Sequence, residues 1–249
     1  MCNKEYINKE TVSLFCNTNE SLLAQSARGI VLEFPGLGGD SCLGGKMSRE
    51  AYVDAYASDL AKEGLILAYI FPGPWSWMNR GSVVISDLVV DALRDKHNLK
   101  EDSPLVAIGG SMGGLGALIY TASSKHKVSA CVAHCPCCDV TKFYNTHPDF
   151  PRTFISAIAS YDIPFYTGLQ EISPRHRIMD MPSVPYLIIS DEKDEVFDSG
   201  DIQEYAQQLQ DVVTSKVIYH CLPDLTHGQL TPQMYWDIKN FIIEKSKIN

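Results

Sequence analysis

Short apolar runs alternate with helix-like segments along most of the chain, and this alternation restricts the fold more than any other feature. The apolar runs have the length of buried strands and lie at residues 29–34, 65–71, 104–108, 128–133, 186–190 and 216–221. The helix-like segments between and after them lie at residues 48–63, 82–97, 111–120, 201–209 and 233–245. Such alternation predicts an α/β fold with a mostly parallel sheet that helices cover on both faces.

The alternation breaks between about residues 136 and 182, where prolines and aromatic side chains are frequent. An irregular stretch of this length inside a folded domain is usually functional. We therefore expect a single domain over residues 1–249 with an inserted cap or lid at about residues 136–182, including a helix near residues 153–160. Residues 6–15 are expected to form a hairpin at the edge of the sheet.

Charge and hydropathy exclude several classes of partner. The formal net charge is −9 and no cluster of Lys and Arg stands out, which argues against nucleic acid or an anionic membrane. No apolar run approaches the length of about 20 residues that spans a bilayer. The first residues lack the apolar core of a secretory signal, so we expect a cytoplasmic protein.

Eight cysteines are present, and reduced thiols are expected in the cytosol. The segment His134-Cys135-Pro136-Cys137-Cys138 suggests a metal site. Structural zinc sites usually show two separated pairs of ligands, however, and no second pair is visible. The spacing is not the C-x-x-C of redox sites either. We therefore predict free thiols at a strand end and no metal.

A G-x-S-x-G pentapeptide at residues 109–113 lies where the strand-like run 104–108 meets a helix-like segment. A serine in such a sharp turn projects its hydroxyl above the sheet, and only small neighbours tolerate the crowded backbone. The turn also aims the free N–H groups of the helix at any oxyanion formed there. Ser111 is therefore the candidate nucleophile.

A serine nucleophile needs a base and an acid that orients the base. Asp194 follows the strand-like run 186–190, and His227 follows the last strand-like run. The carboxyl ends of parallel strands share one edge of the sheet, so Ser111, His227 and Asp194 can converge there. Other acids remain open for the role of Asp194: Asp139, Asp191 and Glu192.

An oxyanion hole requires two N–H donors near the serine. Met112 follows the nucleophile and should supply one. The other should come from the glycine-rich loop Pro35-Gly36-Leu37-Gly38-Gly39, with Leu37 as the expected donor. A glycine-rich turn without this role remains the alternative.

A second wall of the substrate pocket is predicted in the loop at residues 72–80, which carries Trp75 and Trp77. Exposing two tryptophans is unfavourable, so they either line the pocket or pack under the cap. Arg80 is a candidate partner for a substrate carboxylate, and a surface ion pair is the alternative.

From about Gly29 to the C-terminus the chain resembles the α/β-hydrolase superfamily, most specifically at the pentapeptide and in a second segment at residues 173–196. Within it, the second segment is similar to the end of the catalytic domain in prolyl-oligopeptidase-like hydrolases and their small esterase relatives. The resemblance implies a mostly parallel sheet of about eight strands, with Asp194 as acid and His227 as base. The chain departs from it at residues 34–36, where Phe-Pro-Gly replaces the His-Gly of many members.

Together these features predict a serine hydrolase, and we favour a carboxylesterase that acts on a small-molecule ester of small or medium size. The reaction would pass through an acyl-enzyme and require no cofactor. Two alternatives stay open: a peptidase or amidase for short peptides, and a non-catalytic binding protein that keeps the fold.

Overall fold

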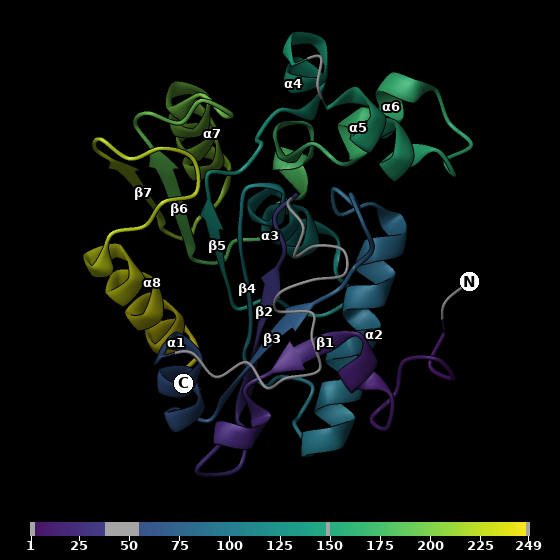
Figure 1. Ribbon diagram of the computed structural model, residues 1–249, viewed down its shortest axis with the longest axis vertical. Helices are drawn as coiled ribbons and strands as arrows, with labels where there is room; N and C mark the ends of the chain where they lie inside the picture. Colours follow the sequence, from purple (N-terminus) through teal and green to yellow (C-terminus); the bar gives the residue numbers. More distant parts are fainter. Residues whose placement is uncertain (1–2, 38–54, 148–149, 248–249) are drawn as a thin grey trace.

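A computed structural model describes residues 3–37, 55–147 and 150–247 of the chain (Figure 1). Its centre is a sheet of the order β1-β3-β2-β4-β5-β6-β7, in which only β1 runs antiparallel to its neighbour. The strands are β1 (Cys16–Thr18), β2 (Gly29–Phe34), β3 (Leu65–Ile70), β4 (Leu105–Gly110), β5 (Ala130–His134), β6 (Tyr186–Asp191) and β7 (Val217–Leu222). The predicted mostly parallel α/β sheet is confirmed, with seven strands in the described residues where about eight were expected.

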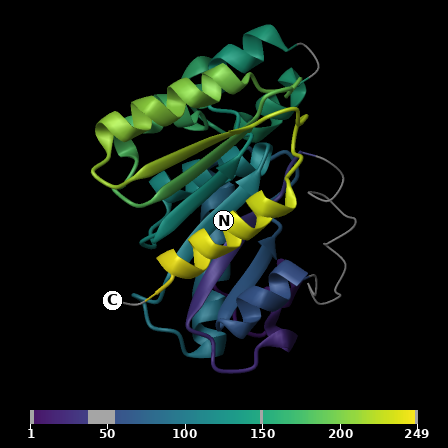
Figure 2. The same cartoon turned by 90° about the vertical axis from the view of Figure 1, so that its left-hand side faces the viewer.

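Helices cover both faces of this sheet. One face packs against α2 (Arg80–His97), α3 (Met112–Ser123) and α7 (Ser199–Val212), and the other against α1 (Ala55–Lys62) and α8 (Pro232–Lys245). Figure 2 shows α8 crossing the second face. Successive strand residues point to opposite faces, so Ile30 and Leu32 join the first core while Val31 joins the second. This explains why the strands are continuous apolar runs.

Side-chain caps fix where several helices begin. Asn79 accepts a hydrogen bond from the Ser82 N–H at the start of α2, so this helix begins two residues before the predicted position. Asp198 and Thr231 cap α7 and α8 in the same way. The described part of the predicted helix at residues 48–63 is α1, and its predicted N-cap, Ser48, lies outside the described residues.

The predicted hairpin at residues 6–15 is wrong. The segment forms turns and the 3₁₀ helix η1 (Val12–Leu14), and a second 3₁₀ helix, η2 (Glu20–Leu22), follows β1. Asn8 Oδ1 accepts from the backbone N–H groups of Glu10 and Thr11, and Thr11 Oγ1 accepts from the Asn8 N–H. These local bonds hold the backbone in a turn and compete with strand pairing.

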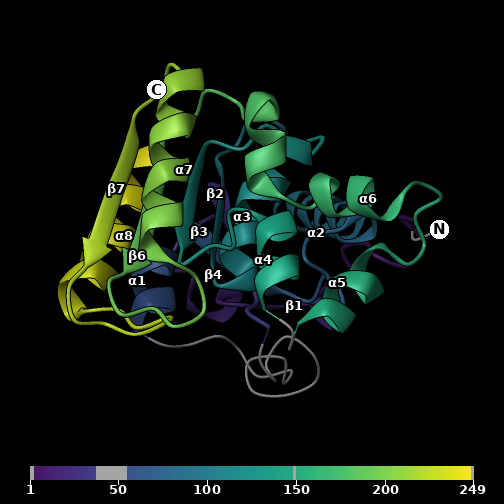
Figure 3. The same ribbon diagram turned by 90° about the horizontal axis from the view of Figure 1, so that it is seen from above.

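Residues 136–182 contain short helices and no strand among their described residues. The helices are α4 (Val140–Thr146), α5 (Pro151–Ile158), α6 (Phe165–Glu171) and the 3₁₀ helix η5 (Pro174–Asp180). Figure 3 shows α4, α5 and α6 grouped on one side of the molecule. The helix expected near residues 153–160 corresponds to α5, and the role of this segment as a cap stays a prediction.

Among the described helices, none combines the length and apolar character needed to cross a bilayer.

Candidate active site

Ser111 occupies a strained turn between β4 and α3. Its backbone has φ 58° and ψ −125°, and residues with a side chain rarely adopt such a positive φ. The glycines of the pentapeptide make the turn possible. A Cβ on Gly113 would lie 2.1 Å from the Phe34 carbonyl oxygen, and one on Gly109 would lie 2.3 Å from the Gly113 carbonyl oxygen. The pentapeptide therefore has the nucleophile-elbow geometry that its sequence predicts.

The structure brings Ser111, His227 and Asp194 together. Ser111 Oγ lies 2.9 Å from His227 Nε2, and His227 Nδ1 lies 2.7 Å from Asp194 Oδ2. The carboxylate can only accept, so Nδ1 carries a proton and Nε2 is free to accept the proton of the serine hydroxyl. This is the hydrogen-bond chain that general-base activation of a serine requires.

Asp194 has the surroundings of an orienting carboxylate. Its side chain is 0% exposed, while that of His227 is 24% exposed. The second oxygen, Oδ1, accepts from the Val196 N–H at 2.7 Å and the Phe197 N–H at 2.9 Å. Burial acts to raise the pKa of Asp194, but the hydrogen bonds from His227, Phe197 and Val196 outweigh it and hold the pKa below its ordinary value. The group is therefore ionised at neutral pH.

The acids left open by the sequence have other partners. Asp139 caps α4 through the Lys142 N–H, and Glu192 accepts from the Asp224 N–H. Asp191, the last residue of β6, pairs with a different histidine, His134. None of these three contacts places its acid on His227.

His134, Cys135 and Asp191 form a second polar cluster beside the triad. The His134 Nε2–H donates to Asp191 Oδ1 at 3.1 Å, and the Cys135 thiol donates to Oδ2 at 3.1 Å. Burial lowers the pKa of His134 and raises the pKa of the Cys135 thiol. The Gln229 N–H also donates to Asp191 Oδ2, at 3.2 Å. Because Gln229 lies two residues after His227, this buried cluster anchors the loop that carries His227.

The glycine-rich loop after β2 reaches Ser111. A Cβ on Gly36 would lie 3.8 Å from the Ser111 Cβ, and Leu37 lines the same cavity as Ser111. Met112 is the first residue of α3, where backbone N–H groups have no partner within the helix. Leu37 and Met112 thus flank the serine as an oxyanion hole requires, and their role stays a prediction. Gly38 and Gly39 lie outside the described residues.

Ser111 and His227 open into a cavity of about 500 Å³, called the Ser111 cavity below. Its walls combine apolar and aromatic side chains with a few polar groups. The lining residues are Glu33, Phe34, Pro35, Gly36, Leu37, Tyr69, Trp77, Gly110, Ser111, His134, Phe150, Val196, Phe197, His227 and Gly228. This combination is typical of a small-molecule site.

A model of the prolyl oligopeptidase family matches residues 76–244, more than half of the chain, and the match includes Ser111, Asp194 and His227. The chain belongs to the prolyl oligopeptidase family. It is therefore a serine hydrolase of the α/β-hydrolase fold. No curated protein sequence matches the chain at a significant level.

Solved structures with the same fold include esterases and peptidases. An inhibited esterase B from Lactobacillus rhamnosis has a TM-score of 0.66 and 12% identity, over 90% of this chain and 79% of the esterase. A truncated carbohydrate esterase from gut microbiota has a TM-score of 0.66 and 16% identity, over 89% of this chain and 87% of the esterase. Porphyromonas gingivalis dipeptidyl peptidase 4 has a TM-score of 0.68 and 15% identity, over 88% of this chain but 31% of the peptidase. At such identities these likenesses show the fold alone.

The two tryptophans of the loop at residues 72–80 have different positions. Trp77 is 1% exposed, lines the Ser111 cavity and donates its indole N–H to Thr153 Oγ1 at 3.0 Å. Trp75 is 36% exposed and does not line that cavity. Both have positive φ, 45° at Trp77 and 47° at Trp75, so the loop turns in a way that its sequence does not reveal.

Arg80 does not reach the Ser111 cavity. Its guanidinium donates to both carboxylate oxygens of Glu171 in α6 and lies over the Tyr161 ring. Arg80 therefore links the start of α2 to residues 136–182, as the ion-pair alternative anticipated, and the structure does not bring it to the candidate substrate site. Sequence reasoning also missed Phe150, which lines the cavity from a segment with no distinctive motif.

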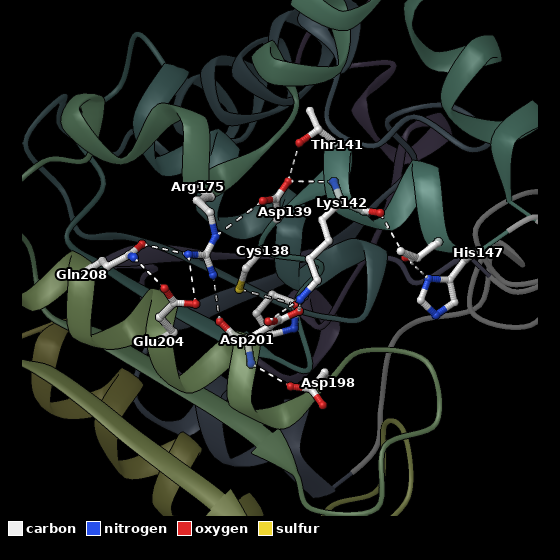
Figure 4. Close-up of polar contacts among 12 residues, drawn as sticks. Cys138, Asp139, Thr141, Lys142, His147, Arg175, Asp198, Asp201, Glu204 and Gln208 are labelled. Carbon is white, nitrogen blue, oxygen red and sulfur yellow. Dashed lines mark hydrogen bonds and ion pairs between the residues drawn. The ribbon is translucent and has the colours of Figure 1, made fainter.

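A second pocket of about 420 Å³ lies on the other side of the loop that carries Asp194. Figure 4 shows ion pairs of three residues that line it, Asp139, Lys142 and Asp201, together with Arg175 beside them. The Lys142 ammonium donates to Asp201 at 2.7 Å, and the Arg175 guanidinium lies 3.7 Å from Asp139. These ion pairs join α4 to α7 and η5, so the pocket lies between helices that are held together by polar contacts.

Proposed function

We propose that the chain is a carboxylesterase that cleaves small or medium acyl esters. One observation carries the proposal: Ser111 Oγ lies 2.9 Å from His227 Nε2, whose Nδ1 lies 2.7 Å from Asp194, at the wall of an accessible cavity. This chain of contacts can remove the serine proton where a substrate carbonyl can approach.

The reaction follows from the roles of these groups. Ser111 Oγ attacks the ester carbonyl while His227 takes its proton, and the Leu37 and Met112 N–H groups bind the oxyanion. His227 then gives the proton to the departing alcohol, leaving an acyl-enzyme. Water activated by His227 hydrolyses that intermediate, and ionised Asp194 stabilises the imidazolium in both steps.

The walls of the Ser111 cavity support an apolar acyl group as the bound part of the substrate. Phe34, Leu37, Trp77, Phe150 and Phe197 present apolar surface to the space next to Ser111. Burying a methylene group is worth about 0.8 kcal/mol. We therefore expect kcat/KM to rise as the acyl chain lengthens, until the cavity is filled.

The test is hydrolysis of p-nitrophenyl esters of graded acyl length by Ser111→Ala and by the native protein. We expect the substitution to lower kcat by on the order of 10⁶-fold, because no other group replaces the nucleophile. Ser26→Ala is the matched control, since Ser26 is exposed and lies before β2, at the far end from the site. Native activity in Ser111→Ala would refute the mechanism.

The family match supports a second candidate, a peptidase or amidase that acts on short peptides. Cleavage of aminoacyl-naphthylamides without cleavage of simple esters would favour it. A fluorophosphonate probe distinguishes both enzymes from a non-catalytic binding protein, because it labels only an activated serine. Folded native protein without label at Ser111 would favour the binding protein.

A further inference from the structure

The cluster of His134, Cys135 and Asp191 has the composition of a metal site that the sequence alone could not reveal. The sequence shows His134 and Cys135 as neighbours without a second ligand pair. The sheet supplies the missing ligand, because β5 ends beside β6 and Asp191 is the last residue of β6. His134 Nε2, Cys135 Sγ and an Asp191 carboxylate oxygen all lie within 4.8 Å of one another.

The spacing of these donor atoms is close to that around a tetrahedral zinc ion. Zinc lies about 2.0–2.2 Å from nitrogen and oxygen ligands and about 2.3 Å from sulfur, which places N and O about 3.3 Å apart and S and O about 3.5 Å apart. The observed separations from Asp191 are 3.1–3.2 Å to His134 Nε2 and 3.1 Å to Cys135 Sγ. The separations of His134 and Cys135 from Asp191 would therefore need to grow by only a few tenths of an ångström.

The surroundings of the cluster are those of a supported ligand set. The Asp191 side chain is 0% exposed, and the Gln229 N–H that bonds its carboxylate fixes its orientation. His134 is 8% exposed at its side chain and lines the Ser111 cavity, which gives an ion a path to the cluster. Water in that cavity can complete the coordination.

We propose that His134, Cys135 and Asp191 bind a divalent cation of the zinc class, and that its binding slows hydrolysis at Ser111. A thiolate with an imidazole and a carboxylate favours zinc over magnesium or calcium, which prefer oxygen ligands. Binding replaces the thiol proton, which is released to solvent, and the Nε2 proton of His134 moves to Nδ1 so that Nε2 can coordinate the cation. The binding half of the proposal is independent of the catalytic role of Ser111, while the inhibition half rests on the proposed function.

Two physical effects couple this site to the triad. Asp191 accepts a hydrogen bond from the backbone N–H of Gln229 in the loop of His227. A bound cation draws electron density from the Asp191 carboxylate, which weakens the hydrogen bond that anchors the loop at Gln229. The cation also opposes a positive charge on His227, which must form when the imidazole takes the Ser111 proton. Replacing the thiol proton by a divalent cation raises the net charge of the cluster by one. The ligand Cys135 Sγ lies within 4.8 Å of His227 and Asp194 donor atoms, so this change in charge acts at short range.

The binding test is titration of metal-free native protein with Co²⁺, a spectroscopic substitute for Zn²⁺. We expect a sulfur-to-cobalt charge-transfer band that Zn²⁺ removes by displacement. Cys135→Ser should abolish the band. His134→Gln should weaken cobalt binding by at least about tenfold, because replacing even a residue that only supports a metal ligand typically lowers the affinity by about that factor. Cys221→Ser is the matched control, because Cys221 is an exposed free thiol. Circular dichroism confirms that each variant is folded.

The inhibition test measures p-nitrophenyl ester hydrolysis against Zn²⁺ concentration, with reversal by a chelator. We expect inhibition of the native enzyme and of Cys221→Ser, and a shift to at least about tenfold more Zn²⁺ in His134→Gln. A native protein without the cobalt band, a band that survives in Cys135→Ser, or one lost in Cys221→Ser would overturn the site. A cobalt band without zinc inhibition, in protein that the fluorophosphonate labels, would overturn the coupling. A cobalt band in protein that is neither labelled nor active would uphold the site and count against the proposed function.

Discussion

Two histidine–aspartate pairs lie side by side at one edge of the sheet, and they differ in what Nε2 of the histidine contacts. His227 and Asp194 are in loops after β7 and β6, and Nε2 of His227 contacts Ser111. His134 and Asp191 are the last residues of β5 and β6, and Nε2 of His134 contacts the carboxylate itself. A pairing of these residue types therefore does not identify a catalytic pair. Contact with a strained, accessible serine does.

The environment separates the two pairs further. Hydrogen bonds hold Asp194 ionised, and its histidine is the more exposed of the two at 24% against 8%. Burial holds His134 in the neutral form. One pair is thus suited to gain and lose a proton during each turnover, while the other is suited to fix a loop. Substitutions in the two pairs can test this difference in role.

The largest contrast is expected between alanine substitutions of the two histidines. His227→Ala removes the base and should lower kcat by on the order of 10⁶-fold, as for loss of the nucleophile. His134→Ala should cost less than about 100-fold, because it shifts the His227 loop without removing a reacting group. Ester hydrolysis and fluorophosphonate labelling measure both. An equal loss of kcat in the two variants would refute the assignment of different roles to the two histidines.

Replacing the orienting acid should reduce the rate by a smaller amount. Asp194→Asn keeps the shape of the side chain but holds His227 in the wrong tautomer, so kcat should fall by about 10⁴-fold. The thermal midpoint should remain near the native value, since the amide oxygen can still accept from the Val196 and Phe197 N–H groups. Glu195→Gln, at an exposed acid in the same loop, is the control. A native kcat in Asp194→Asn would assign the acid elsewhere.

Asp191→Asn should act on stability more than on rate. Three donors converge on this buried carboxylate, from His134, Cys135 and Gln229. An amide would turn its own N–H groups toward them, so we expect a loss of about 3 kcal/mol in the free energy of unfolding. Urea denaturation measures it, with the exposed Asp102→Asn as control. Unchanged stability with a large loss of kcat would make Asp191 part of the reaction.

The parts of this site that follow from the sequence depend on strand ends. Ser111, Asp194 and His227 each follow an apolar run, and parallel strands place their carboxyl ends at one edge. Seeing them together required only the order of strand-like segments along the chain. The glycines around Ser111 gave a further local signal, because the turn leaves no room for a Cβ.

The remaining contacts depend on register and loop conformation, which local sequence does not encode. Arg80 pairs with Glu171 across 91 positions, and Asp191 meets His134 only because β6 continues past Ile189, the register partner of His134. Nothing in the tryptophan loop distinguishes Trp77, which enters the cavity, from Trp75, which does not. The hairpin expected at residues 6–15 failed because side-chain bonds within the segment stabilise a turn.

The smallest expected effect is a pH dependence that Asp194 adds to stability. Its pKa in the folded protein lies below the ordinary value of 3.8. The folded state therefore favours the ionised form of Asp194, and this stabilisation is fully present above the ordinary pKa. It is lost as pH falls through the lower folded pKa, because Asp194 of the unfolded chain takes up its proton at a higher pH than Asp194 of the folded chain. Urea denaturation of native protein and Asp194→Asn from about pH 6 to about pH 3 should show their difference in unfolding free energy shrinking toward acid. A difference that stays constant over this range would mean that the hydrogen bonds from His227, Val196 and Phe197 do not favour the charged carboxylate.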